Sequence, residues 1–253
     1  QFNFSDGDLQ MTGTKITGIR VVNRTTGADE YYSGKIFVDA TYEGDLGAAA
    51  HVPYRIGREA RWEYNEPGAG RTYEYWKSDP AEGSTGDADN AVQAYNYRLC
   101  LISDPSQRAP FIKPENYNRE EFASLVEDVW TGRNTWKMMR GVTKEMREAN
   151  RKAIQNGGKS TLPGDGWGIL KLVTINTLPN GKTDANNQHA AFISTDLPEE
   201  NWPWPTSSWE WRDKFAKRLK DYTLGLFWFA QNDEALPQSF RDEMKNCLLY
   251  TSD

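Results

Sequence analysis

The sequence predicts an α+β protein, with small sheets and amphipathic helices in separate stretches of one chain. Residues 12–41 have the short apolar strands and polar turns of a β-meander, and residues 168–175 are apolar and β-branched like a buried strand. Apolar residues recur at helical spacing over 118–155 and 207–231. A chain of 253 residues can bury a sizeable core, so we expect one or two domains.

The meander is expected to contain three strands. The first is centred on 16–21, where apolar residues alternate with others, and residues 25–29 supply a polar turn. Residues 31–32 begin the return strand, and the apolar run 36–38 forms the last, buried strand. The sheet therefore ends immediately before a polar turn.

That turn and the helix after it are the most informative part of the chain. The strand ends at Asp39, and a helix of very small residues, Gly47 to Ala50, follows the turn. A helix N-terminus offers unpaired N–H groups and a positive dipole end, and small side chains allow close approach, so nucleotide cofactors are commonly held there. Asp45 and Glu43 could accept hydrogen bonds from a ribose or ribityl hydroxyl, or cap the helix. An ordinary strand-turn-helix unit remains the alternative.

Residues 60–94 are rich in Gly, Pro, Asp and Glu and read as a long irregular excursion. Residues 83–90 are expected to be its most flexible part, as a lid, a binding loop or a disordered stretch. A strand over 94–102 follows, with Asn96, Arg98, Cys100 and Ile102 on one face. Arg98 either turns inward as the floor of a substrate pocket or lies in solvent on an edge strand.

Three helical stretches are expected in the rest of the chain, before a short terminal one. Asn118 can cap the first, with Glu121 as the reciprocal residue, and the second covers about 135–155. The longest begins at a capping box of Ser207 and Glu210 and runs to about Gln231. A last helix begins near Pro237.

A polar segment at 180–187 follows the buried strand and is the candidate substrate loop. Asn180-Gly181 alone indicates a turn. The polar side chains that exceed what a turn requires are Lys182, Asp184, Asn186, Asn187 and His189. His189 is a candidate acid or base because its ordinary pKa is near 6.5, although a structural hydrogen-bonding role is the alternative. Lys182 or Arg98 could stabilise negative charge.

Composition excludes several functions. The net charge is −6 and no lysine or arginine cluster stands out, which argues against nucleic acid as a partner. No apolar run approaches the roughly 20 residues that span a bilayer. Two cysteines, Cys100 and Cys247, are too few for an iron–sulfur cluster and are interpreted as buried thiols. Two histidines cannot build a metal site by themselves.

The segment Asp-Ala-Thr-Tyr-Glu-Gly-Asp-Leu at 39–46 resembles the second fingerprint of FAD-dependent oxidoreductases with a glutathione-reductase type of FAD domain. It is most similar to a bacterial branch whose flavin domain is related to that of heterodisulfide reductase, and some members of this branch are loosely labelled xanthan lyase. Tyr42 departs from the glycine usual in the wider superfamily. The further segments that resemble this branch are 54–59, 95–101, 180–187 and 225–229.

The resemblance implies FAD as cofactor and a two-electron oxidation or reduction of a small-molecule or saccharide-derived substrate. It implies a partial FAD-binding domain over 1–58 and a substrate domain over 59–253, with a mixed sheet and C-terminal helices, in a protein that is α/β as a whole. The residues expected to bind FAD are Asp39, Ala40, Thr41, Glu43, Gly44, Asp45 and Leu46. Those expected to be catalytic are His189, Lys182 and Arg98, and those expected to bind substrate are Asp184, Asn186 and Asn187.

No glycine-rich dinucleotide loop follows a strand, and the chain opens at Gln1. We therefore expect an internal or C-terminal fragment of a longer bacterial flavoprotein that is inactive alone, with export of the whole protein left open. The tail 247–253 leaves the helical pattern without a stop signal and has no assigned function. The alternative function is an exported carbohydrate-binding or polysaccharide-lyase module, which the 10 Trp, 12 Tyr and 10 Phe suggest, although aromatic residues more often pack in cores.

Overall fold

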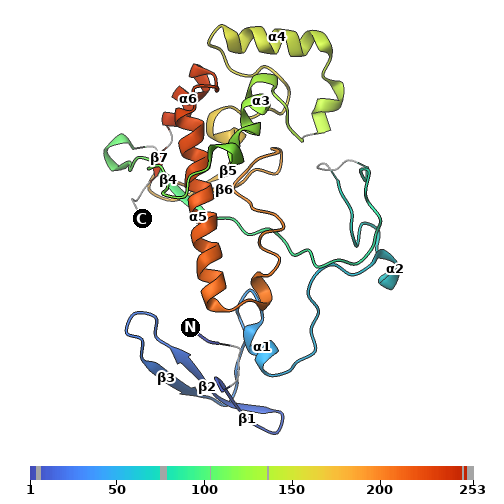
Figure 1. Cartoon of the computed structure of the whole chain (residues 1–253), viewed down its shortest axis with the longest axis vertical. Helices are drawn as coiled ribbons and strands as arrows, with labels where there is room; N and C mark the ends of the chain where they lie inside the picture. The colour runs from blue at the N-terminus through green and yellow to red at the C-terminus, as the bar shows by residue number, and fades with distance from the viewer. Residues whose placement is uncertain (4–6, 75–78, 103, 136, 247, 250–253) are drawn as a thin grey trace. The chain divides into compact units, whose positions relative to one another are not determined.

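The computed structural model describes residues 1–3, 7–74, 79–102, 104–135, 137–246 and 248–249. It divides the chain into two compact units. The first comprises Gln1–Gly57 and Pro203–Asp213, and the second comprises Arg58–Trp202 and Lys214–Asp253. The described residues form two antiparallel sheets and six α-helices, which confirms the predicted α+β class (Figure 1).

The first unit contains the predicted meander. Strands β1 (Leu9–Thr12), β2 (Lys15–Val22) and β3 (Asp29–Ser33) pair antiparallel in the order β1-β2-β3. The strand predicted as the first, centred on residues 16–21, is the middle strand β2, because β1 precedes it at Leu9–Thr12. On β2, Arg20 Nε donates a hydrogen bond to the buried carboxylate of Asp8 at 2.8 Å.

The prediction of a buried strand at 36–38 was wrong. Ile36 is 83% exposed and Val38 79% exposed, and neither belongs to a strand. An apolar run forms a strand only when a neighbour satisfies its backbone N–H and C=O groups, and no described strand pairs with these residues. The predicted helix does form after the turn, as the five-residue α1 (Asp45–Ala49).

The second unit contains a four-stranded sheet in the order β5-β6-β4-β7. Its strands are β4 (Leu99–Ile102), β5 (Val173–Thr177), β6 (Lys182–Asn187) and β7 (Leu248–Leu249). All pairings among these described strands are antiparallel, whereas a mixed sheet was expected. The antiparallel pairing of β5 with β6 follows from the turn that joins them, in which Asn180 (φ 63°) and Gly181 (φ 70°) adopt the left-handed backbone of a tight hairpin.

Two predictions about this sheet need correction. The segment 180–187 was expected to be a loop, but its residues 182–187 form the internal strand β6, with Ala185 buried between β4 and β5. The predicted strand over 94–102 is shorter, since only 99–102 pair with β6 and Asn96 forms an isolated bridge to Asp196. Polar side chains therefore project from a regular strand and not from a flexible loop.

The remaining described α-helices are α2 (Arg61–Tyr64), α3 (Ser124–Thr131), α4 (Lys144–Gln155), α5 (Trp209–Asn232) and α6 (Gln238–Lys245). The first five residues of α5 belong to the first unit and the rest to the second. Short 3-10 helices cover Pro105–Gln107, Arg119–Phe122, Lys137–Gly141, Gly168–Lys171 and Trp204–Thr206. The predicted cap is confirmed, because Asn118 Oδ1 accepts a hydrogen bond from Glu120 N at 3.2 Å. Glu121, which was expected to be the reciprocal residue, instead forms an ion pair with Arg218. The longest helix, α5, is capped by Ser208 and not by the predicted Ser207: Ser208 Oγ accepts a hydrogen bond from Trp211 N in the first turn.

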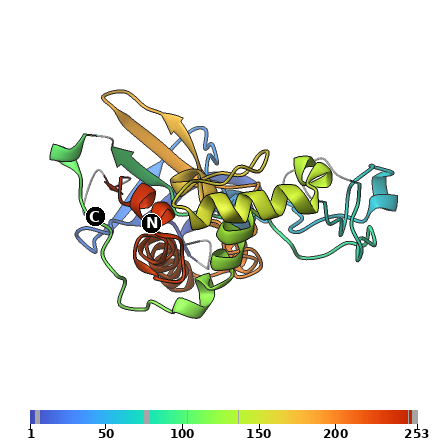
Figure 2. The ribbon, with the colours of Figure 1, turned by 90° about the horizontal axis from the view of Figure 1, so that it is seen from above.

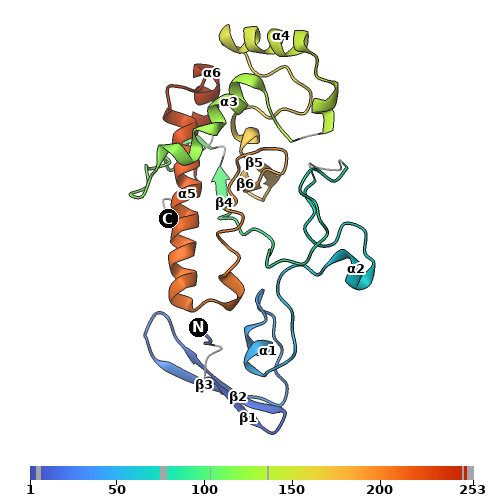
Figure 3. The ribbon, with the colours of Figure 1, turned by 45° about the vertical axis from the view of Figure 1, so that its right-hand side comes forward.

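The core of the second unit is built on α5, which Figure 2 views nearly along its axis and Figure 3 shows beside α3 and α6. Phe122 packs against Tyr222 and Phe229, with ring centroids 5.3 and 5.8 Å apart. Gly225 is needed here, because a Cβ on it would lie 3.0 Å from the Phe122 ring. The fully buried phenylalanines show that much of the aromatic content serves packing.

The excursion after Gly57 is held by hydrogen bonds where flexibility was expected. Arg58 pairs with Asp89 through both backbone and side chain. Arg61 N donates to Gly86 O at 2.9 Å, and Arg71 N donates to Asp87 O at 2.7 Å. Residues 85–89 are therefore fixed to the segment 58–71.

Candidate functional site

We call residues 39–47 the cofactor turn, because the predicted FAD residues lie there. Asp39 Oδ1 accepts from Thr41 N at 3.0 Å and from Thr41 Oγ1 at 2.8 Å, and Asp39 Oδ2 accepts from Gly47 N at 3.0 Å. Thr41 Oγ1 accepts from Gly44 N at 2.9 Å and from Asp45 N at 3.3 Å. Burial raises the pKa of Asp39, but the hydrogen bonds from Gly47, Thr41 and Leu46 outweigh burial and lower it.

These contacts correct the expectation that the start of α1 offers unpaired N–H groups to a ligand. The N–H groups of Gly44, Asp45 and Gly47 already donate to side chains of the same turn. The physical reason is local, since Asp and Thr side chains readily bind nearby backbone N–H groups. The backbone N–H groups of this turn are thus satisfied within the turn itself.

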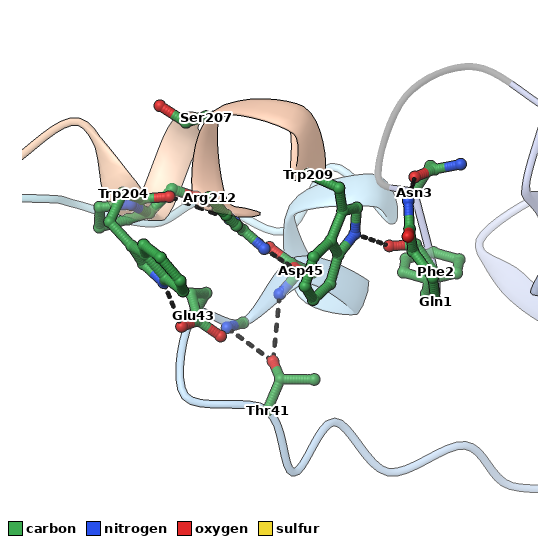
Figure 4. A network of polar contacts seen from close by, with 12 residues as sticks. Gln1, Phe2, Asn3, Thr41, Glu43, Asp45, Trp204, Ser207, Trp209 and Arg212 are labelled. Carbon is green, nitrogen blue, oxygen red and sulfur yellow. Dashed lines mark hydrogen bonds and ion pairs between the residues drawn. The ribbon is translucent and has the colours of Figure 1, made fainter. Parts of the chain in front are cut away.

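Both carboxylates that were expected to meet a ribose have protein partners in the first unit (Figure 4). Asp45 Oδ2 accepts from Arg212 Nη1 at 2.7 Å, and Asp45 Oδ1 accepts from Arg212 Nη2 at 2.9 Å. The side chains of Asp45 and Arg212 are 6% and 1% exposed. Glu43 Oε1 accepts from Trp204 Nε1 at 2.6 Å. A direct contact of either carboxylate with a cofactor remains a prediction.

Arg212 is the centre of this arrangement. Its Nε donates to Trp204 O at 3.0 Å, and its Nη2 donates to Pro205 O at 2.9 Å. The guanidinium carbon lies 5.8 Å from the Trp204 ring centroid and 5.1 Å from that of Trp209. The segment 203–213 therefore binds the cofactor turn through a buried, bidentate ion pair.

The sequence analysis missed this segment, which it interpreted only as the start of a helix. The available signal was an arginine that directly follows a cluster of four tryptophans, at 202, 204, 209 and 211. Arginine stacks on aromatic rings and forms bidentate pairs with carboxylates, so such a cluster marks a buried guanidinium. The partner carboxylate, 167 residues away, could not be identified from spacing.

The first unit contains a cavity of about 480 Å³ beside the cofactor turn, within the size range of small-molecule sites. Of the predicted FAD residues, Glu43, Gly44 and Asp45 line it, while Asp39, Ala40, Thr41 and Leu46 do not. The other lining residues are Gly47, Ala48, Val52, Tyr54, Arg55, Ile56, Pro205 and Thr206. The turn, the segment 52–56 and the segment 205–206 thus form one concave surface.

In the second unit, the polar residues of β6 bind neighbouring segments. Arg98 pairs with Asp184, and the Arg98 side chain is 59% exposed, which favours the solvent alternative over the pocket floor. Asn96 donates to Asn186, and Asn187 Nδ2 donates to Asp196 Oδ2 at 2.8 Å. Burial raises the pKa of Asp196.

Cys100 lies opposite Asp184 on this sheet and is exposed, so its interpretation as a buried thiol was wrong. Within β4 it is the one exposed residue, since Leu99, Leu101 and Ile102 are buried. Cys247 and the tail at 250–253 lie outside the described residues.

His189 lies elsewhere, in a second-unit cavity of about 580 Å³. The cavity is lined by Asn134, Gly164, Asp165, Gly166, Leu170, Lys171, Thr174, Gln188, His189 and Ala190. Lys171 and Asp165 form a buried ion pair in its wall, and Lys171 Nζ also donates to Arg133 O at 2.9 Å. Arg98, Lys182 and Asp184 are not among the residues that line this cavity.

The described part of the chain contains no group of three or more His, Cys, Asp or Glu side chains placed to hold a metal ion. Within the same residues, no helix has both the length and the apolar character needed to cross a bilayer.

Comparison with protein families supplies the class. The model of a family described as FAD dependent oxidoreductase matches residues 5–247. The chain therefore belongs to the FAD-dependent oxidoreductase family, and FAD is the cofactor of that family. Searches of curated proteins and of solved structures gave no match.

Proposed function

We propose that the cavity of the first unit holds a portion of FAD in a two-electron oxidoreductase that acts on a small molecule. The supporting observation is that this cavity is lined by the very turn that resembles the flavoprotein fingerprint. When bound, FAD supplies the electron chemistry, and the protein supplies orientation and polarity.

The lining residues suit such a ligand. Gly47 and Ala48 have small side chains, so a flat or extended group can approach the backbone closely. Val52 and Ile56 supply apolar surface, and Arg55 supplies a cation for the diphosphate. Because Arg212 and Trp204 bind the carboxylates of Asp45 and Glu43, these two acids repel an anion less than free carboxylates would.

The second-unit cavity is the proposed substrate site. His189, which lines this cavity, would accept or donate a proton there. The buried Lys171–Asp165 pair contributes no net charge to the wall, which favours a substrate without a large charge. No comparison supports the alternative of a carbohydrate-binding or polysaccharide-lyase module.

The cofactor assignment is tested by filling the cavity. Ala48 lines it and Ala49, its neighbour on α1, does not, so Ala48→Phe and Ala49→Phe form a matched pair. Both variants are made in the full-length protein. Titration with FAD, followed by quenching of flavin fluorescence, should show binding to the full-length wild type and about tenfold weaker binding to Ala48→Phe. Binding by Ala49→Phe should match the wild type. Equal affinities in all three proteins, or no uptake of FAD by the wild type, would contradict the proposal.

A further inference from the structure

The segment 203–213 has a consequence for cofactor binding that is separate from the lining residues themselves. Pro205 and Thr206 line the first-unit cavity on one side, and the cofactor turn lines it on the other. The two segments are joined by the Asp45–Arg212 pair and by the bond from Trp204 to Glu43. The width of the cavity between them is therefore set by these contacts.

Arg212 is suited to fix this width. Its side chain is 1% exposed, and three of its nitrogens donate to four acceptors, two on Asp45 and two backbone carbonyls of the 204–205 turn. A planar guanidinium holds several acceptors at once in fixed directions, and a lysine ammonium does not. One side chain thus sets the position of both cavity walls.

We propose that Arg212 is a positioning residue for FAD: it fixes the cofactor turn against the segment 204–206 at the spacing that the cofactor requires. The proposal rests on the proposed function of this cavity. Arg212 acts through Asp45 and the carbonyls of Trp204 and Pro205, and it makes no contact with the reacting atoms.

The test separates positioning from stability. Arg212→Gln removes the guanidinium that binds both carboxylate oxygens of Asp45. Arg20→Gln is the control, since Arg20 binds the buried Asp8 in the same unit but does not line the cavity. Two quantities are measured for each variant: the urea midpoint of unfolding, and the Kd for FAD at a temperature where the variant is folded. Both variants should lower the midpoint. Only Arg212→Gln should raise the Kd, by about tenfold, or about 1.4 kcal/mol.

Two further variants keep the test decisive if Arg212→Gln does not fold. Arg212→Lys retains the positive charge but cannot form the bidentate pair, and Asp45→Asn retains the shape of the acceptor without its charge. Both should raise the Kd for FAD, and combining Asp45→Asn with Arg212→Lys should cost less than the sum of the single effects, because the residues act as one unit. A wild-type Kd in folded Arg212→Lys would overturn the inference.

The outcomes also distinguish this inference from the function it rests on. If the wild-type protein takes up no FAD, the proposed function fails and the positioning role fails with it. If the wild type binds FAD and the Arg212 variants bind it equally well, the proposed function stands and only the positioning role is wrong.

Discussion

Lys171 and Asp165 form an ion pair in which neither side chain exposes more than 3% of its surface. The pair lies in the wall of the cavity that His189 lines. Asp165 Oδ2 is buried without a hydrogen-bond partner among the described residues, so the pair is only partly satisfied. Removing either charge leaves the other buried and uncompensated, which is costly.

Lys171→Met should therefore lower the free energy of unfolding by about 3–5 kcal/mol, as measured by urea denaturation. The matched control is Lys217→Met, which breaks an exposed pair with Asp221 on α5 and should cost about 0–1 kcal/mol. The double variant Lys171→Met with Asp165→Asn should be more stable than Lys171→Met alone. Similar losses in the two lysine variants would show that burial does not govern the effect.

The Arg58–Asp89 pair predicts an acid-sensitive contact in the second unit. The hydrogen bond from Arg58 lowers the pKa of Asp89 from 3.8 to about 2. A carboxyl whose pKa is lower in the folded state stabilises the protein above its unfolded pKa, and the stabilisation disappears as pH falls from 3.8 to about 2. The difference in unfolding free energy between the wild type and Asp89→Asn should therefore be constant at neutral pH and shrink over this interval. In an Arg58→Gln background this dependence should diminish, and an unchanged dependence would contradict the assignment to Arg58.

Thr41 is expected to stabilise the cofactor turn through its hydroxyl. Thr41→Val keeps the shape of the side chain but deprives Gly44 N and Asp45 N of their acceptor. The expected loss is about 1–2 kcal/mol of unfolding free energy, with weaker FAD binding. Thr25→Val is the control, because its exposed side chain lies in the turn between β2 and β3. Equal stability of the two variants in urea titrations would show that the hydroxyl of Thr41 is dispensable.

The proposed role of His189 predicts a loss of turnover without a loss of cofactor. With a substrate that bleaches the visible absorbance of bound flavin, His189→Asn should slow bleaching about 100-fold or more. The Kd for FAD should not change. His51→Asn is the control, since His51 is exposed with φ 58°, a conformation that asparagine tolerates. If His189→Asn bleaches at the wild-type rate, His189 does not transfer the proton.

Local patterns predicted the helices well and the strands less well. The stripe on α5 was predictable because helical periodicity involves residues three and four apart, and Leu219, Tyr222 and Leu226 are indeed buried. The strand β6 was misread because its polar residues suggested a loop. A strand in the centre of a sheet still has side chains on two faces, and only Ala185 of β6 is buried.

Local sequence patterns also predicted only part of the candidate cofactor site. Its position was predictable from the order of acid, turn and small-residue helix, whereas the partners of its carboxylates were not. Arg212 lies in the first turn of α5, where a charged residue usually faces solvent. Its burial depends on contacts with residues far away in sequence, which no local pattern encodes.

The first unit draws on both Gln1–Gly57 and Pro203–Asp213, and this has a consequence for synthesis on the ribosome. A nascent chain that has emerged only to Trp202 contains the carboxylate of Asp45 but not the guanidinium that neutralises it. The first unit can therefore complete its fold only after Pro203–Asp213 has been translated, long after its first 57 residues have been made. For the same reason, a chimera that exchanges one of these two segments with a relative must exchange the other as well.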